Sequence, residues 1–273
     1  MHLSHPLFAE VLIAGMSPAS LDARRIEAAR RSGGGSDDTA RFRVDALLAE
    51  TSEPPPAAEM TWAARYAYSL TDHVLALRLA TLALAQESSF DTLLVRAAAL
   101  SSMKSAEAAG ALAEAQAAAG SDREVAMIAR EWARHDAIAS ERPLEAIRRE
   151  TTALDSLTDP QARSLLEDDI ATWRLIVGEG PFAEPRRPDE EPADPLALLG
   201  SIAYEVMYAA QSSEFSRARA AIDRARPLSE LERLSFPLGE QHPRPVRIPG
   251  DRVREGVGRR ADLRRTPPAG ELE

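Results

Sequence analysis

Small side chains recur on one face of successive helical segments, and this feature limits the possible fold more than any other. Positions i, i+4 and i+7 are mostly small in four segments that start 32, 38 and 72 residues apart, namely Ala76/Ala80/Ala83, Ala108/Leu112/Ala115, Ala146/Glu150/Ala153 and Ala218/Ile222/Ala225. Small residues at this spacing share one helix face and let a neighbouring helix approach closely. Because 72 residues make two repeats of 36, the pattern predicts an all-α, tetratricopeptide-like right-handed α-solenoid of antiparallel helix pairs.

The hydrophobic periodicity predicts helices over most of the chain. Residues 1–53 are expected to form a helical segment of their own, with helices after Ser4, near 18–32 and near 37–51. A triple proline then separates them from the repeats, which are expected over 57–240. The expected repeat helices lie near 57–69, 71–86, 89–102, 105–119, 121–139, 143–156, 160–177, 195–211 and 213–226. They alternate as the first (A) and second (B) helix of each pair.

Two segments interrupt the helical pattern. Residues 180–195, GPFAEPRRPDEEPADP, hold five prolines and five acids, so we expect the B helix there to be shortened or replaced by an exposed loop. At this point we expect a kink in the stack or a mobile excursion. In residues 241–273, 17 of 33 residues are Arg, Gly or Pro, and Leu263 and Leu272 are the only leucines. That composition predicts a disordered tail. It is also typical of a shifted reading frame in a GC-rich gene, so we expect a frameshift or truncation near residue 242.

Composition and charge exclude several functional classes. The chain has no cysteine, so disulfides, thiolate metal sites and cysteine nucleophiles are excluded. Its single lysine, Lys104, follows no glycine-rich phosphate loop. Residues 1–240 carry 25 basic against 38 acidic side chains, which disfavours nucleic acid as a partner. No apolar run is long enough to cross a bilayer, and the N-terminus does not resemble a secretion signal. The expected location is the cytoplasm.

Two pairs of titratable residues suggest chemistry. Glu131 and His135 lie at i and i+4 with Asp136 beside them, a spacing that can supply two metal ligands. A metal site needs a third ligand and no second histidine cluster exists, so we interpret them as part of a surface helix. Asp72 and His73 begin a helix, where the acid favours the positive helix end. We expect a helix cap there, with a catalytic pair as the alternative.

Other candidates are weaker. Trp62, Trp132 and Trp173 each fall in an A helix, where we expect helical core and keep a ligand-lined groove as the alternative. For His2 and His5, near the chain end, no specific role is expected. The acids of the proline-rich segment can bind a cation in principle, but their spacing predicts a solvated loop; they are Asp189, Glu190, Glu191 and Asp194. The tail arginines are interspersed with five acids, which disfavours nucleic-acid binding.

Four stretches carry a family resemblance. The opening SHPLFAEVL (4–12) resembles a box that follows the nucleotide-binding module in large LuxR-type, MalT-like, ATPase-containing transcriptional regulators. The stretches 93–126, 141–163 and FPLGE (236–240) are similar to the helical repeat array of those regulators. The resemblance covers residues 4–240. It identifies 1–53 with the end of a winged-helix segment and 57–240 with the repeats.

The resemblance implies a sensing role. Full-length members combine an ATPase, a helical repeat sensor and a DNA-binding helix-turn-helix, but no position here matches the ATPase or DNA-binding motifs. We therefore expect the sensing and protein-interaction region of such a regulator, binding a protein or small-molecule effector on the concave face built from A helices. We expect no enzyme activity, cofactor, metal, membrane or direct nucleic-acid contact. A stand-alone adaptor that binds a peptide or protein is the alternative, and an α/α enzyme is a weaker one. Residues 213–240 are expected to self-associate through an uncovered last repeat.

Overall fold

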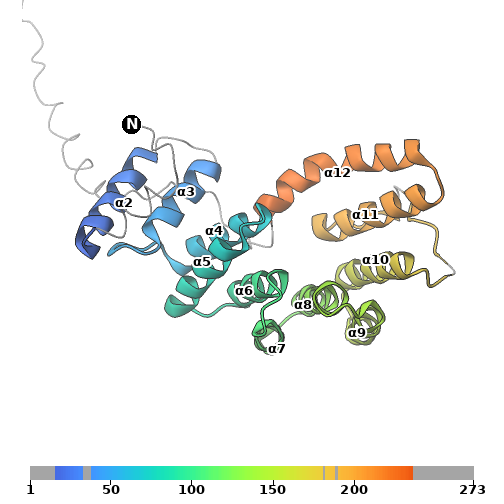
Figure 1. Ribbon diagram of the computed structural model, residues 1–273. Coiled ribbons are helices and arrows are strands. Elements are labelled where there is room, and N and C mark those ends of the chain that lie inside the picture. The colour runs from blue at the N-terminus through green and yellow to red at the C-terminus, as the bar shows by residue number, and fades with distance from the viewer. Residues whose placement is uncertain (1–15, 33–37, 181, 188–189, 236–273) are drawn as a thin grey trace, which may run out of the picture. The chain divides into compact units, whose positions relative to one another are not determined.

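The computed structural model describes residues 16–32, 38–180, 182–187 and 190–235, and the secondary structure within these ranges is helical (Figure 1). An all-α fold is therefore confirmed for this part of the chain. The expected first helix, His2, His5 and the tail 241–273 lie outside the described residues. The helices are α2 (Pro18–Ser32), α3 (Asp38–Leu48), α4 (Ala57–Ser69), α5 (His73–Gln86), α6 (Phe90–Ser102), α7 (Ala108–Ala118), α8 (Asp122–Arg134), the π-helical turn η1 (His135–Ala139), α9 (Pro143–Ser156), α10 (Pro160–Val177), α11 (Pro195–Gln211) and α12 (Phe215–Ser235).

The described residues divide into two compact units at residue 55. The first holds α2 and α3, which bury Ala29 against Val44 and Leu48. Asp22 on α2 also accepts hydrogen bonds from the backbone and the hydroxyl of Ser52, at 2.8 and 2.7 Å. The second unit holds α4 to α12. None of the described helices is both long and apolar enough to cross a membrane.

Helix ends in the second unit follow from local sequence. Asp72, Ser89 and Ser121 each accept a hydrogen bond from the backbone N–H three residues later, which satisfies a donor that the helix leaves free. Asp159 and Asp194 cap α10 and α11, and a proline fills the first helical position of each. The sequence places each of these caps directly before a helical apolar pattern, so most predicted boundaries agree with the structure within a few residues.

The turns from A to B helices repeat one backbone device. Each contains one non-glycine residue with a positive φ: Thr71 (63°), Lys104 (53°), Glu141 (56°) and Ser213 (61°). These positions are 33, 37 and 72 residues apart, close to the intervals of the small-residue pattern. A left-handed residue ends a helix and reverses the chain within a few residues. The repeat seen in the sequence is thus also a repeat of backbone geometry.

Helix pairs pack in two layers. The A helices α4, α6, α8 and α10 follow one another as neighbours, and α5, α7 and α9 each pack on the A helices beside them (Figure 1). Polar contacts join successive A helices at one-repeat separations: Tyr68 Oη lies 3.2 Å from Ser102 Oγ, and Ser101 Oγ lies 3.1 Å from His135 Nδ1. Each pair of helices therefore contacts its neighbours in the stack.

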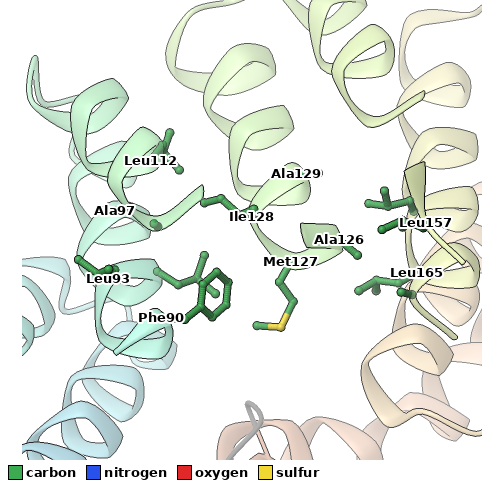
Figure 2. Packing of buried hydrophobic residues seen from close by; sticks show 14 of the residues in the cluster. Phe90, Leu93, Ala97, Leu112, Ala126, Met127, Ile128, Ala129, Leu157 and Leu165 are labelled. Carbon is green, nitrogen blue, oxygen red and sulfur yellow. The ribbon is translucent and has the colours of Figure 1, made fainter. Parts of the chain in front are cut away.

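The core lies where the two layers meet. Figure 2 shows Leu93 on α6, Leu112 on α7, Ile128 on α8 and Leu165 on α10 in one buried cluster. The first two small-residue triplets are fully buried, as predicted, since close approach requires that face. In the last triplet the prediction is wrong for Ile222, whose surface is 47% exposed. Ala218 of this triplet is buried as predicted, and Ala221 rather than Ile222 follows it on the buried face of α12.

The proline- and acid-rich segment forms a loop, as predicted, and α11 packs directly on α10 without a B helix between them. The described part of the loop contacts the neighbouring helices through side chains, and the expected kink or mobile excursion stays a prediction. Arg186 contacts Asp168 (Nε–Oδ1 3.2 Å) and Glu167 (Nη2–Oε2 2.9 Å) on α10. The Tyr204 hydroxyl donates to the backbone carbonyl of Ala183. These contacts replace part of the packing that a B helix would supply.

Candidate functional site

A groove between the B helices α7 and α9, with α8 beneath them, is the candidate site. Its volume is about 570 Å³, within the range of ligand pockets. The floor and one wall are apolar, and the rim is polar. The lining residues are Gln116, Val125, Ile128, Ala129, Trp132, Glu145, Arg148, Arg149, Thr152, Ala153 and Ser156. Because α7 is short and rich in alanine, it contributes only Gln116 to this lining and leaves space beside α9.

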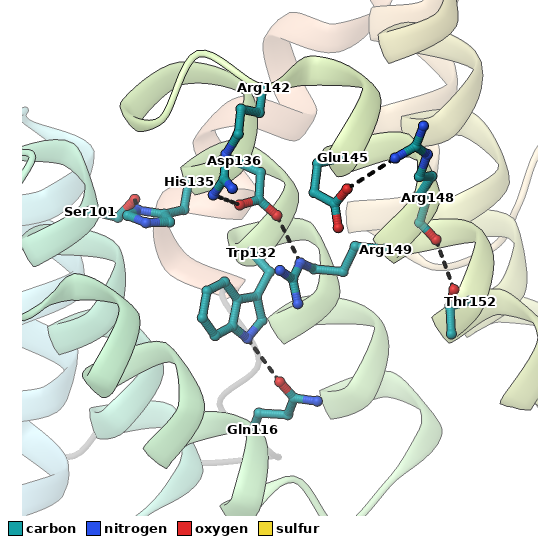
Figure 3. A network of polar contacts seen from close by, with 10 residues as sticks. All are labelled: Ser101, Gln116, Trp132, His135, Asp136, Arg142, Glu145, Arg148, Arg149 and Thr152. Carbon is teal, nitrogen blue, oxygen red and sulfur yellow. Dashed lines mark hydrogen bonds and ion pairs between the residues drawn. The ribbon is translucent and has the colours of Figure 1, made fainter.

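The C-terminal end of α8 builds the polar side of the groove. After Arg134 the helix widens into the π-helical turn η1, a feature common at functional sites. The turn places Asp136 in a fully buried position. Its carboxylate accepts hydrogen bonds from Arg142 Nη2 at 3.3 Å and from Arg149 Nε at 2.8 Å (Figure 3). A buried carboxylate held by two guanidinium groups fixes both arginines relative to α8.

Trp132 is held on both its polar edge and its face. The indole Nε1–H donates to Gln116 Oε1 at 2.9 Å, which joins α8 to α7. The guanidinium carbon of Arg149 lies 4.4 Å from the centroid of the indole, a cation–π contact. The half-buried indole therefore cannot rotate freely and offers a fixed aromatic surface in the groove. Figure 3 shows this chain of contacts from Gln116 through Trp132 and Arg149 to Asp136.

The rim of the groove is positively charged. Arg148 lies on the solvent side, with its side chain 73% exposed, and only Glu145 pairs with it, at 3.4 Å. The lining itself holds two guanidinium groups, of Arg148 and Arg149, and one carboxylate, of Glu145. It therefore carries one net positive charge in a chain of net charge −10, while the buried Asp136 behind it pairs with Arg149 and with Arg142 outside the lining.

A buried acid–base cluster lies on the other side of α9. Glu150 is fully buried, and its carboxyl oxygens receive no hydrogen bond from the described residues. Burial and the nearby Asp169 carboxylate raise the pKa of Glu150 to about 11, so this acid is protonated at neutral pH. Burial opposes ionisation of Asp169 as well, but Arg130 (Nη2–Oδ1 3.2 Å) lowers the pKa of Asp169 below its ordinary value. The cluster ties α8, α9 and α10 together beside the groove.

The predicted metal candidates occupy different environments. Glu131 is buried and pairs with Arg134 at 3.0 Å, so its assignment to a surface helix pair is wrong. Glu131 faces inward because α8 packs between its neighbours α6 and α10 as well as against α7 and α9. His135 is half-buried against Ser101, and Asp136 is buried between its two arginines. Within the described ranges, no three acidic or imidazole side chains converge as metal ligands.

The structure gives a separate outcome for each predicted tryptophan and for the predicted helix cap. Trp62 is buried core, as predicted, and Trp173 packs against the large core cluster. Trp132 also packs against this cluster and in addition lines the groove, so its role as part of a ligand groove stays a prediction. Asp72 is the predicted cap, since its carboxylate accepts the Leu75 N–H at 3.0 Å. The ring of His73 packs against Tyr68 with the centroids 5.1 Å apart.

The acids of the loop are engaged rather than solvated. Glu191 pairs with Arg224 at 2.6 Å. Asp194 caps α11 and also contacts Arg123, two repeats earlier in the chain. Glu190 Oε2 accepts from the backbone N–H of Arg187 at 3.4 Å. The prediction of a solvated loop is therefore wrong for Glu191 and Asp194, because arginines from α8 and α12 reach them. Asp189 lies outside the described residues.

The arginines in and beside the groove were not predicted from the sequence. Arg142, Arg148 and Arg149 did not stand out, because arginine makes up nearly all of the basic residues of the chain. Their spacing is the available signal, with three arginines in the eight residues 142–149, shortly after His135 and Asp136. The groove also lies between B helices. The expected effector surface, the face of the A helices, stays a prediction.

Fold and site together define an all-helical repeat protein with an aromatic, arginine-rimmed groove. Comparison of the chain with protein-family models, curated proteins and solved structures finds no match. The resemblance to LuxR-type regulators thus rests on the quoted stretches of sequence alone.

Proposed function

We propose that this chain is a helical-repeat sensing and protein-interaction module, and that the groove between α7 and α9 binds a peptide segment of its partner. The observation that carries the proposal is the fixed Trp132, held by Gln116 and Arg149 over an apolar floor. Stacked helix pairs commonly present extended binding surfaces. A half-buried indole with its N–H satisfied and a face in a groove is typical of an anchor for apolar side chains.

The repeat geometry supports a tetratricopeptide-like solenoid. The left-handed residues of the A-to-B turns recur at intervals of 33, 37 and 72, close to multiples of the 34-residue period of that repeat class. We take the stack as right-handed, as in that class. The resemblance to large LuxR-type regulators supplies the context, in which ligand binding to the repeats shifts a conformational equilibrium.

Selection of peptides tests the proposed function directly. The full chain is panned against a library of random short linear peptides, and binding is then followed by the indole N–H resonances of the three tryptophans. We expect the selected peptides to shift the Trp132 resonance and to leave that of Trp62, in the core, in place. Trp132→Ala should weaken binding by about tenfold or more, as for a central aromatic anchor. A chain that selects no peptide, or peptides that leave the Trp132 resonance unmoved, contradicts the proposal.

A stand-alone adaptor protein, the alternative to a regulator region, would use the same groove. The neighbouring genes distinguish the two. A reading frame for an ATPase upstream and one for a helix-turn-helix downstream favour a regulator. Unrelated neighbouring genes favour a stand-alone adaptor. The nucleotide sequence around codon 242 separately tests the frameshift hypothesis, which fails if no other frame continues the helical pattern.

A further inference from the structure

We infer that the groove between α7 and α9 selects partner segments in which an aspartate or glutamate lies beside an apolar side chain. This inference rests on the proposed function and names the chemical class of its ligand. Three features carry it: the charge of the rim, the availability of its donors and the contrast between rim and floor.

The charge argument starts from Asp136. This carboxylate is fully buried and holds two guanidinium groups, so it neutralises only one of their two charges. Arg148 adds a third guanidinium, which Glu145 balances across 3.4 Å in an exposed position. Glu150, buried on the other side of α9, is protonated and contributes no negative charge at neutral pH, and Asp155, the remaining acid of α9, lies outside the lining. The lining itself thus holds the two guanidinium groups of Arg148 and Arg149 against the single carboxylate of Glu145, and an incoming carboxylate would reduce this excess of positive charge.

The donor argument concerns Arg148 and Arg149. Arg149 contacts Asp136 through Nε, and this bond leaves its terminal nitrogens beside Trp132 in the lining of the groove. Arg148 contributes a second, exposed guanidinium on the adjacent position of α9. Guanidinium groups bind carboxylates through paired N–H donors in a fixed plane. Arg149 is already oriented by Asp136 and the indole, so little side-chain entropy is lost when it binds a ligand.

The apolar argument concerns the floor. Ile128 and Ala129 on α8 and Ala153 on α9 form a surface without charged groups, directly below the rim. A ligand that fills this floor must cover it with an apolar side chain, since a polar group there would lose its hydration without a partner. An acidic residue next to an apolar one satisfies rim and floor together. Nucleic acid fits less well, because its phosphates would meet the net negative charge of the surrounding chain.

Parallel selections test the acidic class. The random peptide library is panned against the wild-type chain, against Arg148→Gln and against the control Arg174→Gln, which changes an exposed arginine in the last turn of α10. We expect the wild-type and Arg174→Gln pools to be enriched in Asp and Glu relative to the input library, and the Arg148→Gln pool to lose much of this enrichment. In a selected peptide, Glu→Gln at the enriched position should weaken binding about tenfold, as for a lost charge-assisted hydrogen bond.

The outcomes separate this inference from the proposed function. Peptides that shift the Trp132 resonance but show no acidic enrichment overturn the inference and leave the groove as a peptide site. Acidic enrichment that persists in Arg148→Gln and in Arg149→Gln also overturns it, because the acid would then be read elsewhere. If no peptide binds, both fail. Circular dichroism of each variant shows whether the helices remain, and Arg148→Gln is the decisive variant because its side chain is exposed and makes one weak ion pair.

Discussion

At the scale of single residues, backbone strain lies at the turns between A and B helices. Thr71 has φ 63°, a conformation that costs a β-branched residue about 1–2 kcal/mol relative to its ordinary one. Glycine adopts this conformation without that cost, so Thr71→Gly should stabilise the chain by about 1 kcal/mol. Urea unfolding followed by circular dichroism measures it. In the matched control Thr81→Gly, within α5, the glycine should destabilise by a similar amount. A loss of stability in Thr71→Gly would show that the Thr71 hydroxyl contact with the Leu70 carbonyl outweighs the strain.

Glu150 gives a second prediction at this scale, because its pKa differs between the folded and unfolded chain. Folding raises this pKa to about 11 from about 4.5, so the folded state holds a proton that the unfolded state releases between these values. The contribution of Glu150 to stability is therefore greatest below pH 4.5 and is lost progressively as the pH rises toward 11. Glu150→Gln removes this loss and should stabilise the chain at pH 7 by about 1–3 kcal/mol.

Unfolding measured at several pH values checks this linkage. The stability gain from Glu150→Gln should grow between pH 5 and pH 9, whereas the exposed control Glu87→Gln should give a small difference that does not grow. A gain that is independent of pH would mean that Glu150 is ionised in the folded chain. The sequence marks Glu150 as unusual, because it is the one polar residue at the small or apolar positions of the repeat pattern, but it does not identify the partners of Glu150. Its partners Arg130 and Asp169 are about twenty residues away on other helices, and only packing brings them together.

At the scale of elements, most helix boundaries could be predicted from the sequence. The exceptions, the turn η1 and the anchoring of the loop before α11, depend on contacts between helices. Capping residues and prolines are local signals, so α4, α9, α10 and α11 begin where the sequence predicts. The turn η1 was not predicted, because a π-helical turn arises from tertiary contacts of Asp136 rather than from local propensity. The anchoring of the loop before α11 was missed for the same reason, since Arg186 finds its partners on α10.

The anchored loop gives a prediction about this element. Arg186→Gln removes the ion pairs with Glu167 and Asp168, so residues 182–187 should exchange amide hydrogens several times faster. The neighbouring Arg187→Gln is the control, because its side chain is exposed and Glu190 contacts only its backbone. Hydrogen–deuterium exchange with mass spectrometry measures both. Equal exchange in the two variants would mean that the Tyr204 hydrogen bond and the buried ring of Pro185 hold the loop without Arg186.

The same loop should respond to pH. Burial raises the pKa of Asp168 to about 6, against the opposing effect of Arg186. Opening the loop hydrates Asp168 and returns its pKa toward the ordinary value of 3.8, so the closed loop holds a proton more tightly than the open loop. Exchange in residues 182–187, corrected for the intrinsic pH dependence, should therefore slow from pH 7 to pH 5 as Asp168 gains its proton in the closed state. In Asp168→Asn this change should be absent, since the amide carries no titrating proton. A loop equally protected at both pH values in the wild type contradicts the prediction.

At the scale of the whole molecule, repetition made the fold class predictable and the groove unpredictable. The spacing of small residues reports how closely A and B helices pack, and this close packing holds in full for the first two triplets. The groove depends on a departure from repetition, in which the short, alanine-rich α7 leaves space beside α9. The small-residue spacing describes what the repeats share, so it does not reveal a groove that depends on the short α7 of a single repeat. The three-arginine stretch after Asp136 was the one local signal of that departure.

Exposed apolar side chains on α12 give the last prediction, which concerns association between copies. Phe215 is 70% exposed and Ile222 is 47% exposed, and their spacing of seven residues places them on one face of the helix. Large apolar side chains that share a face favour association, because pairing removes their surface from water. Sedimentation velocity over a concentration series should show a reversible increase in mass, and Phe215→Ser should weaken it about tenfold or more. Arg219→Gln, on the same helix, keeps both apolar residues and should associate as the wild type does. A chain that sediments as a monomer at every concentration would mean that one exposed face of α12 buries too little apolar area to offset the entropy of association.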